Sequence, residues 1–290
     1  MEGILISGFA DEISFLFDEQ LKTVRDLGMK FISLRSADGK SIADYTLEEV
    51  KTQLKPRLEA AGIGVSSIGS PIGKVDIRDD AGFEKQLIQL DTLCQIAEEL
   101  NCRYIRMFSF FMPAGEDPAL YRDKVISKLQ QFISVAAKYN VILMHENEKD
   151  IYGDVGSRCR DLMDALGSDS FRNCFDFANY VQCGEDPLLC WELLKKDTVY
   201  IHIKDAVSGN KENVLCGTGE GQIPRILQQA ICEESYRGFL TLEPHLVLFS
   251  ALQSLETADA KSIIKENKYK DGASGYAAQY RALTDILNQF

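Results

Sequence analysis

The stretch Val141-Ile-Leu-Met-His-Glu-Asn-Glu148 decides the fold. Its apolar residues run as far as Met144, and four polar residues, two of them glutamates, follow at once. A buried strand that ends in this way presents carboxylates at the mouth of the structure that buries it. Three later apolar runs end similarly, at Asp176, His202 and Glu243. We therefore predict a set of buried strands that carry functional groups at their carboxyl ends.

Eight such apolar runs alternate with segments of helical periodicity along the chain. They cover residues 4–8, 31–34, 63–68, 104–108 and 141–144 and the three runs that end at Asp176, His202 and Glu243. Strands separated by helices are parallel and are joined by right-handed crossovers. Eight such units fit a closed (β/α)8 TIM barrel better than an open sheet. No glycine-rich dinucleotide fingerprint and no linker is present, so we predict one α/β barrel domain over residues 1–290.

Capping signals mark several of the helices. Thr46-Leu-Glu-Glu49 is a capping box, and Gly62 is the expected stop of the helix that it opens. Asp117-Pro118 and Asp186-Pro187 each place an N-cap acid before a proline at the first helical position. The predicted helices cover residues 16–27, 46–61, 80–100, 117–139, 156–166, 223–232, a segment from 186 onward, and the chain from the last apolar run to Phe290.

Composition excludes several classes of function. The chain has 290 residues, a net charge of −12 and 45% hydrophobic residues. Such acidity argues against a protein that binds the phosphate backbone of nucleic acids. None of the eight cysteines forms a C-x-x-C pair, and most lie in apolar segments, which predicts buried reduced thiols in a cytoplasmic protein. No apolar run is long enough to span a membrane. A homo-oligomer is left open.

The barrel fold predicts where the polar strand ends meet. Because the carboxyl ends of all barrel strands face one side, Glu146, Asp176, His202 and Glu243 should converge. Three converging carboxylates repel one another unless a cation lies between them. One imidazole and three oxygens suit Mn²⁺, Mg²⁺, Co²⁺ or Zn²⁺, whereas a calcium site would normally use oxygen alone. We therefore predict one divalent metal ion as the cofactor.

Each ligand also has a simpler interpretation. Glu148 could face inward in place of Glu146, Asp176 could be only a helix N-cap, and His202 could be a hydrogen-bonded core residue. Four such residues on four successive strands favour the metal site.

Further polar residues near the strand ends are candidates for substrate binding. Arg35, Arg106 and Lys204 could bind hydroxyls, a carboxylate or a phosphate of a substrate. Buried arginines in barrels also pair with buried acids, and this structural role is the alternative. His245 follows Glu243 by two residues and would face the same side, if the strand continues past the intervening proline.

Five short motifs resemble those of a known family. They are Leu-Met-His-Glu-Asn147, Phe-Asp-Phe-Ala-Asn179, Ile-His-Ile-Lys-Asp205, Gly217-Thr-Gly-Glu-Gly221 and Leu-Thr-Leu-Glu-Pro-His245. In this order and spacing the chain resembles the xylose-isomerase-like barrels, the sugar phosphate isomerase/epimerase superfamily, over essentially its whole length.

The resemblance implies the same four metal ligands. It further implies that Glu146 and Glu243 move a proton through an enediolate, and that the substrate is a small sugar or polyol such as a keto sugar, an inosose or a hydroxy keto acid. Two positions depart from the family's ketose epimerases. Asn179, a further substrate-binding candidate, stands where those enzymes carry histidine. No residue matches the glutamate that they carry at the end of the second strand, where this chain has Ser33, Leu34 and Arg35.

Other functions stay open at this point. A dehydratase of the same superfamily, of the inosose or dehydroshikimate type, begins with the same proton abstraction. A non-catalytic barrel that binds a sugar is an alternative from a different functional class. Endonuclease IV relatives share the fold, but their metal cluster needs many histidines, and this acidic chain has three.

Overall fold

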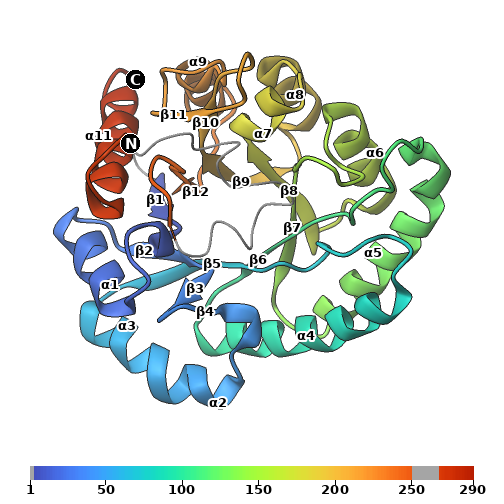
Figure 1. The fold of residues 1–290 in the computed structure, drawn as a ribbon, viewed down its shortest axis with the longest axis horizontal. Coiled ribbons are helices and arrows are strands. Elements are labelled where there is room, and N and C mark those ends of the chain that lie inside the picture. The colour runs from blue at the N-terminus through green and yellow to red at the C-terminus, as the bar shows by residue number, and fades with distance from the viewer. Residues whose placement is uncertain (1–2, 250–267) are drawn as a thin grey trace.

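The computed structural model describes residues 3–249 and 268–290, and within them eight parallel strands form one sheet wound into a barrel (Figure 1). The strands are β1 (Leu5–Gly8), β2 (Phe31–Leu34), β5 (Gly64–Gly69), β6 (Tyr104–Met107), β7 (Ile142–Glu146), β8 (Phe171–Asp176), β9 (Thr198–Ile203) and β12 (Phe239–Leu242). Their order is β1-β12-β9-β8-β7-β6-β5-β2, and a parallel bridge between Phe9 and Ser33 brings the two ends of the sheet together. The predicted TIM barrel is confirmed.

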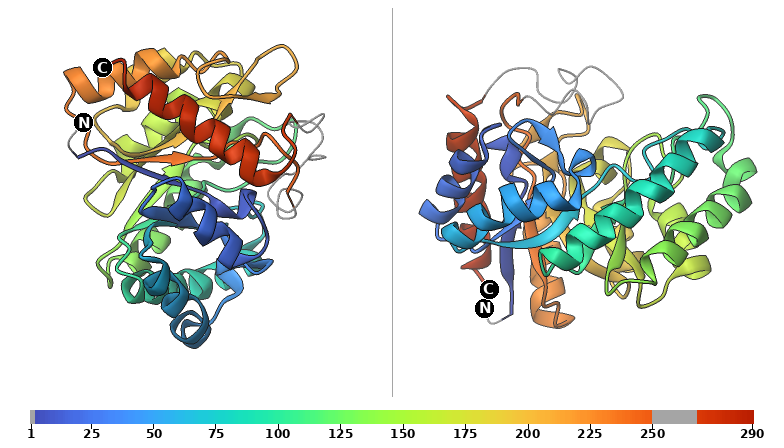
Figure 2. Two further views of the ribbon diagram at one scale, coloured as in Figure 1. Left: turned by 90° about the vertical axis from the view of Figure 1, so that its left-hand side faces the viewer. Right: turned by 90° about the horizontal axis from the view of Figure 1, so that it is seen from below.

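Helices surround the barrel on its outside, as the side views show (Figure 2). They are α1 (Phe17–Asp26), α2 (Leu47–Glu49), α3 (Lys55–Ala61), α4 (Asp80–Glu99), α5 (Arg122–Ala136), α6 (Gly156–Leu166), α7 (Phe177–Gln182), α8 (Pro187–Leu194), α9 (Ile223–Gln228) and α11 (Gly272–Leu287). The capping signals work as predicted. Asp186 Oδ1 accepts a hydrogen bond from Leu188 N at 2.9 Å, and Gly62 adopts the left-handed conformation with φ of 67°. Caps and stops of this kind are readable from sequence because they act locally.

Some predicted helices differ from the observed ones. The helix that begins after Thr46 contains a π-helical turn at Val50–Leu54, directly before Pro56, whose missing N–H interrupts the regular α-helical pattern. The predicted helix from the last strand to Phe290 is wrong for residues 244–249 and 268–271, which are not helical, and residues 250–267 lie outside the described part. Pro244 and the positive φ of 46° at His245 turn the chain away from a helix there.

Two short hairpins on the chain were not predicted. They are β3 (Ser36–Ala37) with β4 (Lys40–Ser41), and β10 (Asp205–Ala206) with β11 (Asn213–Val214). No helix of the described residues is long and apolar enough to cross a membrane. All eight cysteines are free and six of them are buried, but Cys183 is only partly buried and Cys232, which two glutamates follow, is exposed.

Alternate residues of β9 face the barrel interior and define its layers. Tyr200 lies in the lower layer, where its hydroxyl bonds Ser66 Oγ at 2.8 Å, Ser67 Oγ at 3.0 Å and Thr241 Oγ1 at 2.6 Å. His202 comes two residues later, and so faces the same interior one layer higher. The polar layer around Tyr200 therefore forms the floor beneath the carboxyl-terminal strand ends.

Asp205 holds the loop that follows β9. Its carboxylate accepts four backbone N–H bonds of 2.9 Å, from Ala206, Gly217, Gly219 and Gly221. A Cβ on Gly219 would lie 2.4 Å from Asp205 Oδ1, so this position needs glycine. The Lys-Asp and Gly-Thr-Gly-Glu-Gly motifs are therefore two halves of one anchor, which fixes the β10–β11 hairpin beside the strand ends.

The variant Asp205→Asn tests this anchor. An amide keeps one accepting oxygen but turns an N–H₂ group toward backbone donors, and each buried donor left unpaired costs about 1–3 kcal/mol. We expect urea unfolding, followed by circular dichroism, to show a free energy of unfolding lower by about 2 kcal/mol or more. Asp169→Asn removes the same charge at an exposed site and should change little. If the two variants lose the same free energy of unfolding, Asp205 contributes to stability only through its charge.

Candidate metal centre

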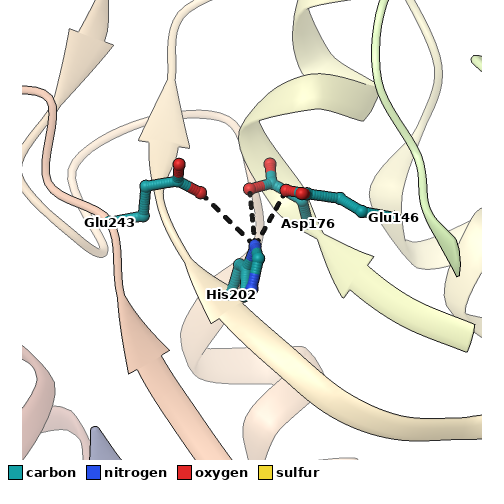
Figure 3. A group of neighbouring side chains, drawn as sticks. All are labelled: Glu146, Asp176, His202 and Glu243. Carbon is teal, nitrogen blue, oxygen red and sulfur yellow. Dashed lines mark hydrogen bonds and ion pairs between the residues drawn. The ribbon is translucent and has the colours of Figure 1, made fainter. Parts of the chain in front are cut away.

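Four side chains meet at the carboxyl end of the barrel (Figure 3). They are Glu146, Asp176, His202 and Glu243, and one potential ligand atom from each lies within 4.8 Å of all the others. His202 Nδ1 lies 2.8 Å from Glu146 Oε1, 3.3 Å from Glu243 Oε2 and 4.0 Å from Asp176 Oδ2. All four side chains are buried. The structure thus brings together the set that the strand ends predict, and we refer to it as the four-residue cluster.

Neighbouring strands place these residues at one height. Glu146 and Asp176 are the last residues of β7 and β8, and Glu243 directly follows β12. Asp176 pairs with His202 in the register of β8 and β9, and Thr241 pairs with His202 in that of β12 and β9. Glu146 pairs with Cys174, two residues before Asp176, and Glu243 lies two residues beyond Thr241. The stagger of the tilted barrel strands therefore brings four residues that are distant in sequence to the same level.

Asp176 has two roles at once. Its Oδ1 accepts a hydrogen bond of 2.8 Å from Asn179 N and caps α7, as the simpler interpretation of this residue expects. Its Oδ2 belongs to the cluster, is buried, and accepts no hydrogen bond from the described residues. One carboxylate oxygen thus fixes the side chain and leaves the other for a ligand.

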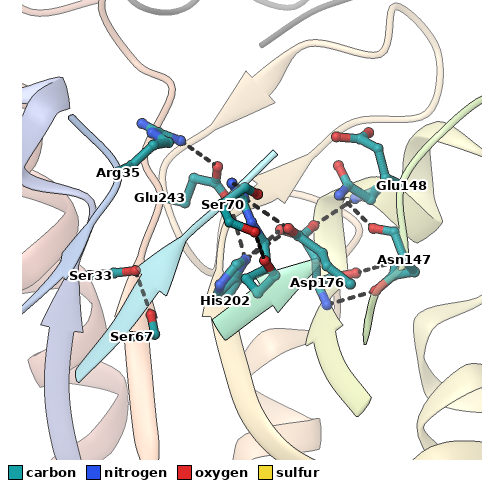
Figure 4. A network of polar contacts seen from close by, with 12 residues as sticks. Ser33, Arg35, Ser67, Ser70, Asn147, Glu148, Asp176, His202 and Glu243 are labelled. Carbon is teal, nitrogen blue, oxygen red and sulfur yellow. Dashed lines mark hydrogen bonds and ion pairs between the residues drawn. The ribbon is translucent and has the colours of Figure 1, made fainter. Parts of the chain in front are cut away.

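Two asparagines lock the ends of β7 and β8 together. Asn147 accepts from Asp176 N at 2.9 Å and donates to Asp176 O at 3.0 Å (Figure 4). Asn179 Nδ2 donates to Asn147 O at 2.8 Å. Asn179, predicted from the resemblance to bind substrate, thus has an N–H engaged with the backbone beneath the cluster, and its substrate contact stays a prediction.

A buried arginine holds each glutamate of the cluster. Arg106 Nη1 donates to Glu146 Oε2 at 3.0 Å, and Arg35 Nη1 donates to Glu243 Oε1 at 3.0 Å. Arg35 also donates to both carboxylate oxygens of Asp11, at 2.9 and 3.0 Å. The arginines therefore pair with buried acids, as the structural interpretation expects, and they orient the two glutamates from outside the cluster.

Lys204 and His245 reach the cluster from the layer above. Lys204 Nζ lies 3.2 Å from Asp176 Oδ2 and 3.5 Å from Glu243 Oε2. His245 lies beyond the end of β12, and its Nε2 is 3.5 Å from Glu243 Oε1. Both side chains are buried. They add one positive charge and one imidazole to the groups in contact with the cluster.

Glu148 lies on the same inward side as Glu146, two residues further along the chain. It pairs with Lys74 at a distance of 3.2 Å and does not join the cluster. Of the two glutamates that could face inward, Glu146 is the one that meets His202.

Sequence reasoning missed Asp11 and Glu12. They follow β1 and are buried against Arg35, and Glu12 Oε2 accepts from His245 N at 2.7 Å. Burial raises the pKa of Glu12 to about 8, although Arg35 acts in the opposite direction. The signal was available, because these acids follow the first apolar run just as Glu146 follows the fifth.

The pKa values of two carboxyl groups in the cluster are shifted in opposite directions. Burial, together with the charges of Glu146 and Glu243, raises the pKa of Asp176 to about 7 against the effect of Lys204. Burial also acts to raise the pKa of Glu146, but His202 and Arg106 outweigh it and lower that pKa to about 2. The pKa of Asp176 is raised because its negative charge would add to the charges of the neighbouring carboxylates. A divalent cation would offset that repulsion and favour the ionised form of Asp176.

The acids around the cluster outnumber the cations in the described part of the chain. The acids are Asp11, Glu12, Glu146, Glu148, Asp176 and Glu243, and the cations are Arg35, Lys74, Arg106 and Lys204. Lys149 also acts on Glu148, and the pKa of His202 is held well above its ordinary value, so part of this negative charge is offset within the site. A divalent ion would take the place of the protons that Asp176 and His202 hold.

A cavity of about 650 Å³ lies among the loops on the same face of the barrel, and no residue of the cluster lines it. Lys149 and Asp150, which follow Glu148, form one wall, and the end of α7 at Gln182 forms another. Ser208 in the β10–β11 hairpin completes it. Segments that follow three of the cluster's strands thus build this space, as βα loops build the ligand sites of TIM barrels.

Known proteins share this architecture. A curated relative, the 2-epi-5-epi-valiolone 7-phosphate 2-epimerase of Actinoplanes sp. (strain ATCC 31044 / CBS 674.73 / SE50/110), is 26% identical over 235 residues, which are 79% of this chain and 73% of the relative. A solved structure of the IOLI protein with a bound zinc atom has a TM-score of 0.76 at 13% identity, covering 99% of both chains. An L-ribulose 3-epimerase structure has a TM-score of 0.74 at 18% identity, covering 100% of this chain and 95% of that one.

The two solved structures, at these identities, show the fold alone. Family membership rests on the sequence itself. A model of the xylose isomerase-like TIM barrel family matches residues 21–265, which is most of the chain, and this protein therefore belongs to that family.

Proposed function

We propose that this protein is a divalent-metal-dependent isomerase or epimerase that acts on a small keto sugar, inosose or hydroxy keto acid. One observation carries the proposal: three carboxylates and an imidazole from four consecutive strands of the barrel converge in a buried space. The curated relative, named a 2-epi-5-epi-valiolone 7-phosphate 2-epimerase, supports the class of reaction.

The donor set fits a divalent ion. Asp176 Oδ2 is buried without a hydrogen bond from the described residues, and His202 Nδ1 points at the carboxylates. Mn²⁺, Mg²⁺, Co²⁺ and Zn²⁺ all accept one nitrogen and several oxygens. When bound, such an ion supplies Lewis acidity, which makes the C–H next to a substrate carbonyl easier to deprotonate.

In this proposal the two glutamates transfer the proton. Figure 3 shows Glu243 on one side of His202 and Glu146 on the other. A carboxylate on each side can remove a proton from one face of a substrate carbon and return a proton to the other face or to the next carbon. Arg106 and Arg35 keep the two carboxylates in these orientations.

The layer above the cluster supplies the groups that would hold the substrate. The Lys204 ammonium, buried between Asp176 and Glu243, is placed to donate to a substrate oxygen and to stabilise the negative charge of an enediolate. Arg35, Arg106 and His245 border the same space through their contacts with the two glutamates.

Glutamine variants test the roles of the two glutamates. Glu146→Gln and Glu243→Gln keep an oxygen that can bind metal but remove the basic carboxylate, and general base catalysis is worth about 10²–10⁴-fold. We expect each variant to lose about that factor in exchange of a substrate C–H proton with D₂O, followed by NMR. Asp176→Asn and His202→Ala should instead lose activity through loss of metal, and excess metal should partly restore it.

The exchange readout separates the alternatives. Exchange reports deprotonation, whether isomerisation or dehydration follows, so product analysis decides between an isomerase and a dehydratase. A non-catalytic sugar-binding barrel would bind substrate without exchange. If both glutamine variants keep wild-type exchange with metal bound, the two-carboxylate mechanism is wrong, and Lys204 and His245 are the next bases to test.

The pH dependence of metal binding gives a second test. The pKa of Asp176 is raised to about 7, and the pKa of His202 is held well above its ordinary value because Cys174 and Glu146 outweigh the opposing effect of burial. Both groups must lose protons before they bind a cation. Metal affinity should therefore rise with pH, and each ion that binds should release more protons at pH 6, below the pKa of Asp176, than at pH 8, above it.

Calorimetry in buffers of different ionisation enthalpy measures this proton release directly. The protein must first be stripped of metal, and the titration should show one ion per chain. Metal binding at pH 6 without proton release would contradict the assignment of Asp176 and His202 as ligands.

A further inference from the structure

A second cavity, of about 600 Å³, opens at the other end of the barrel. Tyr104 at the start of β6 and Thr198 at the start of β9 form its inner wall. Lys195 and Lys196, which follow α8, and Arg237, which precedes β12, form its rim. The strands are parallel, so this amino-terminal end lies opposite the four-residue cluster, and no residue of the cluster lines it.

Three cations and one acid, Glu234, line the cavity, so the lining carries a net positive charge. Lys195 pairs with Glu234 at 2.6 Å and with Glu192 at 2.8 Å. Lys196 has no ion-pair partner among the described residues, and Arg237 Nη1 donates only to backbone carbonyls, those of Ile231 at 3.1 Å and Tyr236 at 2.7 Å. Two cations without acid partners at one cavity are notable in a chain of net charge −12. Such a rim attracts anions.

Flat rings line the same cavity. Tyr236 is fixed by its hydroxyl, which donates to Phe239 O at 2.9 Å. The ring of Tyr104 packs against that of Tyr200 with centroids 5.6 Å apart. Trp191 also lines the space, and its buried Nε1 has no hydrogen-bond partner in the described part of the chain. The aromatic walls are therefore held in place and suit a planar ligand.

We propose that this cavity binds a small molecule that joins a flat ring to a phosphate group, the class to which nucleoside monophosphates belong. Lys196 and Arg237 supply charge-assisted hydrogen bonds to the phosphate, and the tyrosines and Trp191 contact the ring. The volume is that of an ordinary small-molecule site. The role is one of binding without catalysis, and it does not depend on the function proposed for the metal centre.

Trp191 provides a direct readout, because it is the one tryptophan of the chain. Adenosine monophosphate, titrated into metal-free full-length protein, should change its fluorescence saturably. Inorganic phosphate and adenosine each lack one half of the ligand and should bind about tenfold or more weakly. The proposal is overturned if adenosine monophosphate causes no saturable change, or if inorganic phosphate binds as tightly.

A charge reversal locates the site. Lys196→Glu alters an exposed side chain without an acid partner in the described structure, so the fold should persist, and affinity for adenosine monophosphate should fall about tenfold or more. Lys138→Glu makes the same charge change at another exposed lysine that does not line the cavity, and it should leave affinity unchanged. If both variants weaken the binding of adenosine monophosphate equally, the effect comes from net charge alone, and the proposed site is refuted.

Discussion

Repulsion among buried carboxylates is the constraint on which the site depends. Glu146, Asp176 and Glu243 offer oxygens within 4.8 Å of one another, away from water. Ionised acids in such a place need positive charge at short range. Arg106, Arg35 and Lys204 supply part of it, each at 3.0 to 3.2 Å from one acid. A divalent cation at the centre would supply the rest, and the proposed chemistry follows from that need.

One strand shows how the fold meets this constraint. Along β9 and its extension, Tyr200 joins the polar floor, His202 joins the cluster and Lys204 lies above it. The next residue, Asp205, anchors the glycine loop through four backbone bonds. Because every second residue of a strand faces the interior, Tyr200, His202 and Lys204 lie in three successive layers, which form the floor, the proposed metal site and the proposed substrate contact. The Asp205 anchor keeps the end of the strand rigid. Figure 4 shows His202 beside Glu243 and Asp176 in this arrangement.

Much of the fold and the cluster follows from the sequence, because apolar runs that end in acids are local signals. Features that depend on contacts between residues distant in the sequence could not be predicted in this way. The pairing of Arg35 with Asp11, and the division of labour between the two oxygens of Asp176, need the packed barrel. The expected C-terminal helix fails after Glu243 because Pro244 and the left-handed backbone of His245 redirect the chain. The periodicity of apolar residues does not predict that turn.

X-ray absorption spectroscopy at the edge of the metal that the purified protein retains tests the central claim most directly. The account predicts one ion per chain, ligated by one imidazole nitrogen and otherwise by oxygen. Sulfur in the first coordination sphere would contradict it, since Cys174 lies beside His202 and is the alternative soft ligand. More than one ion per chain, or a spectrum unchanged in the His202→Ala variant, would also contradict it.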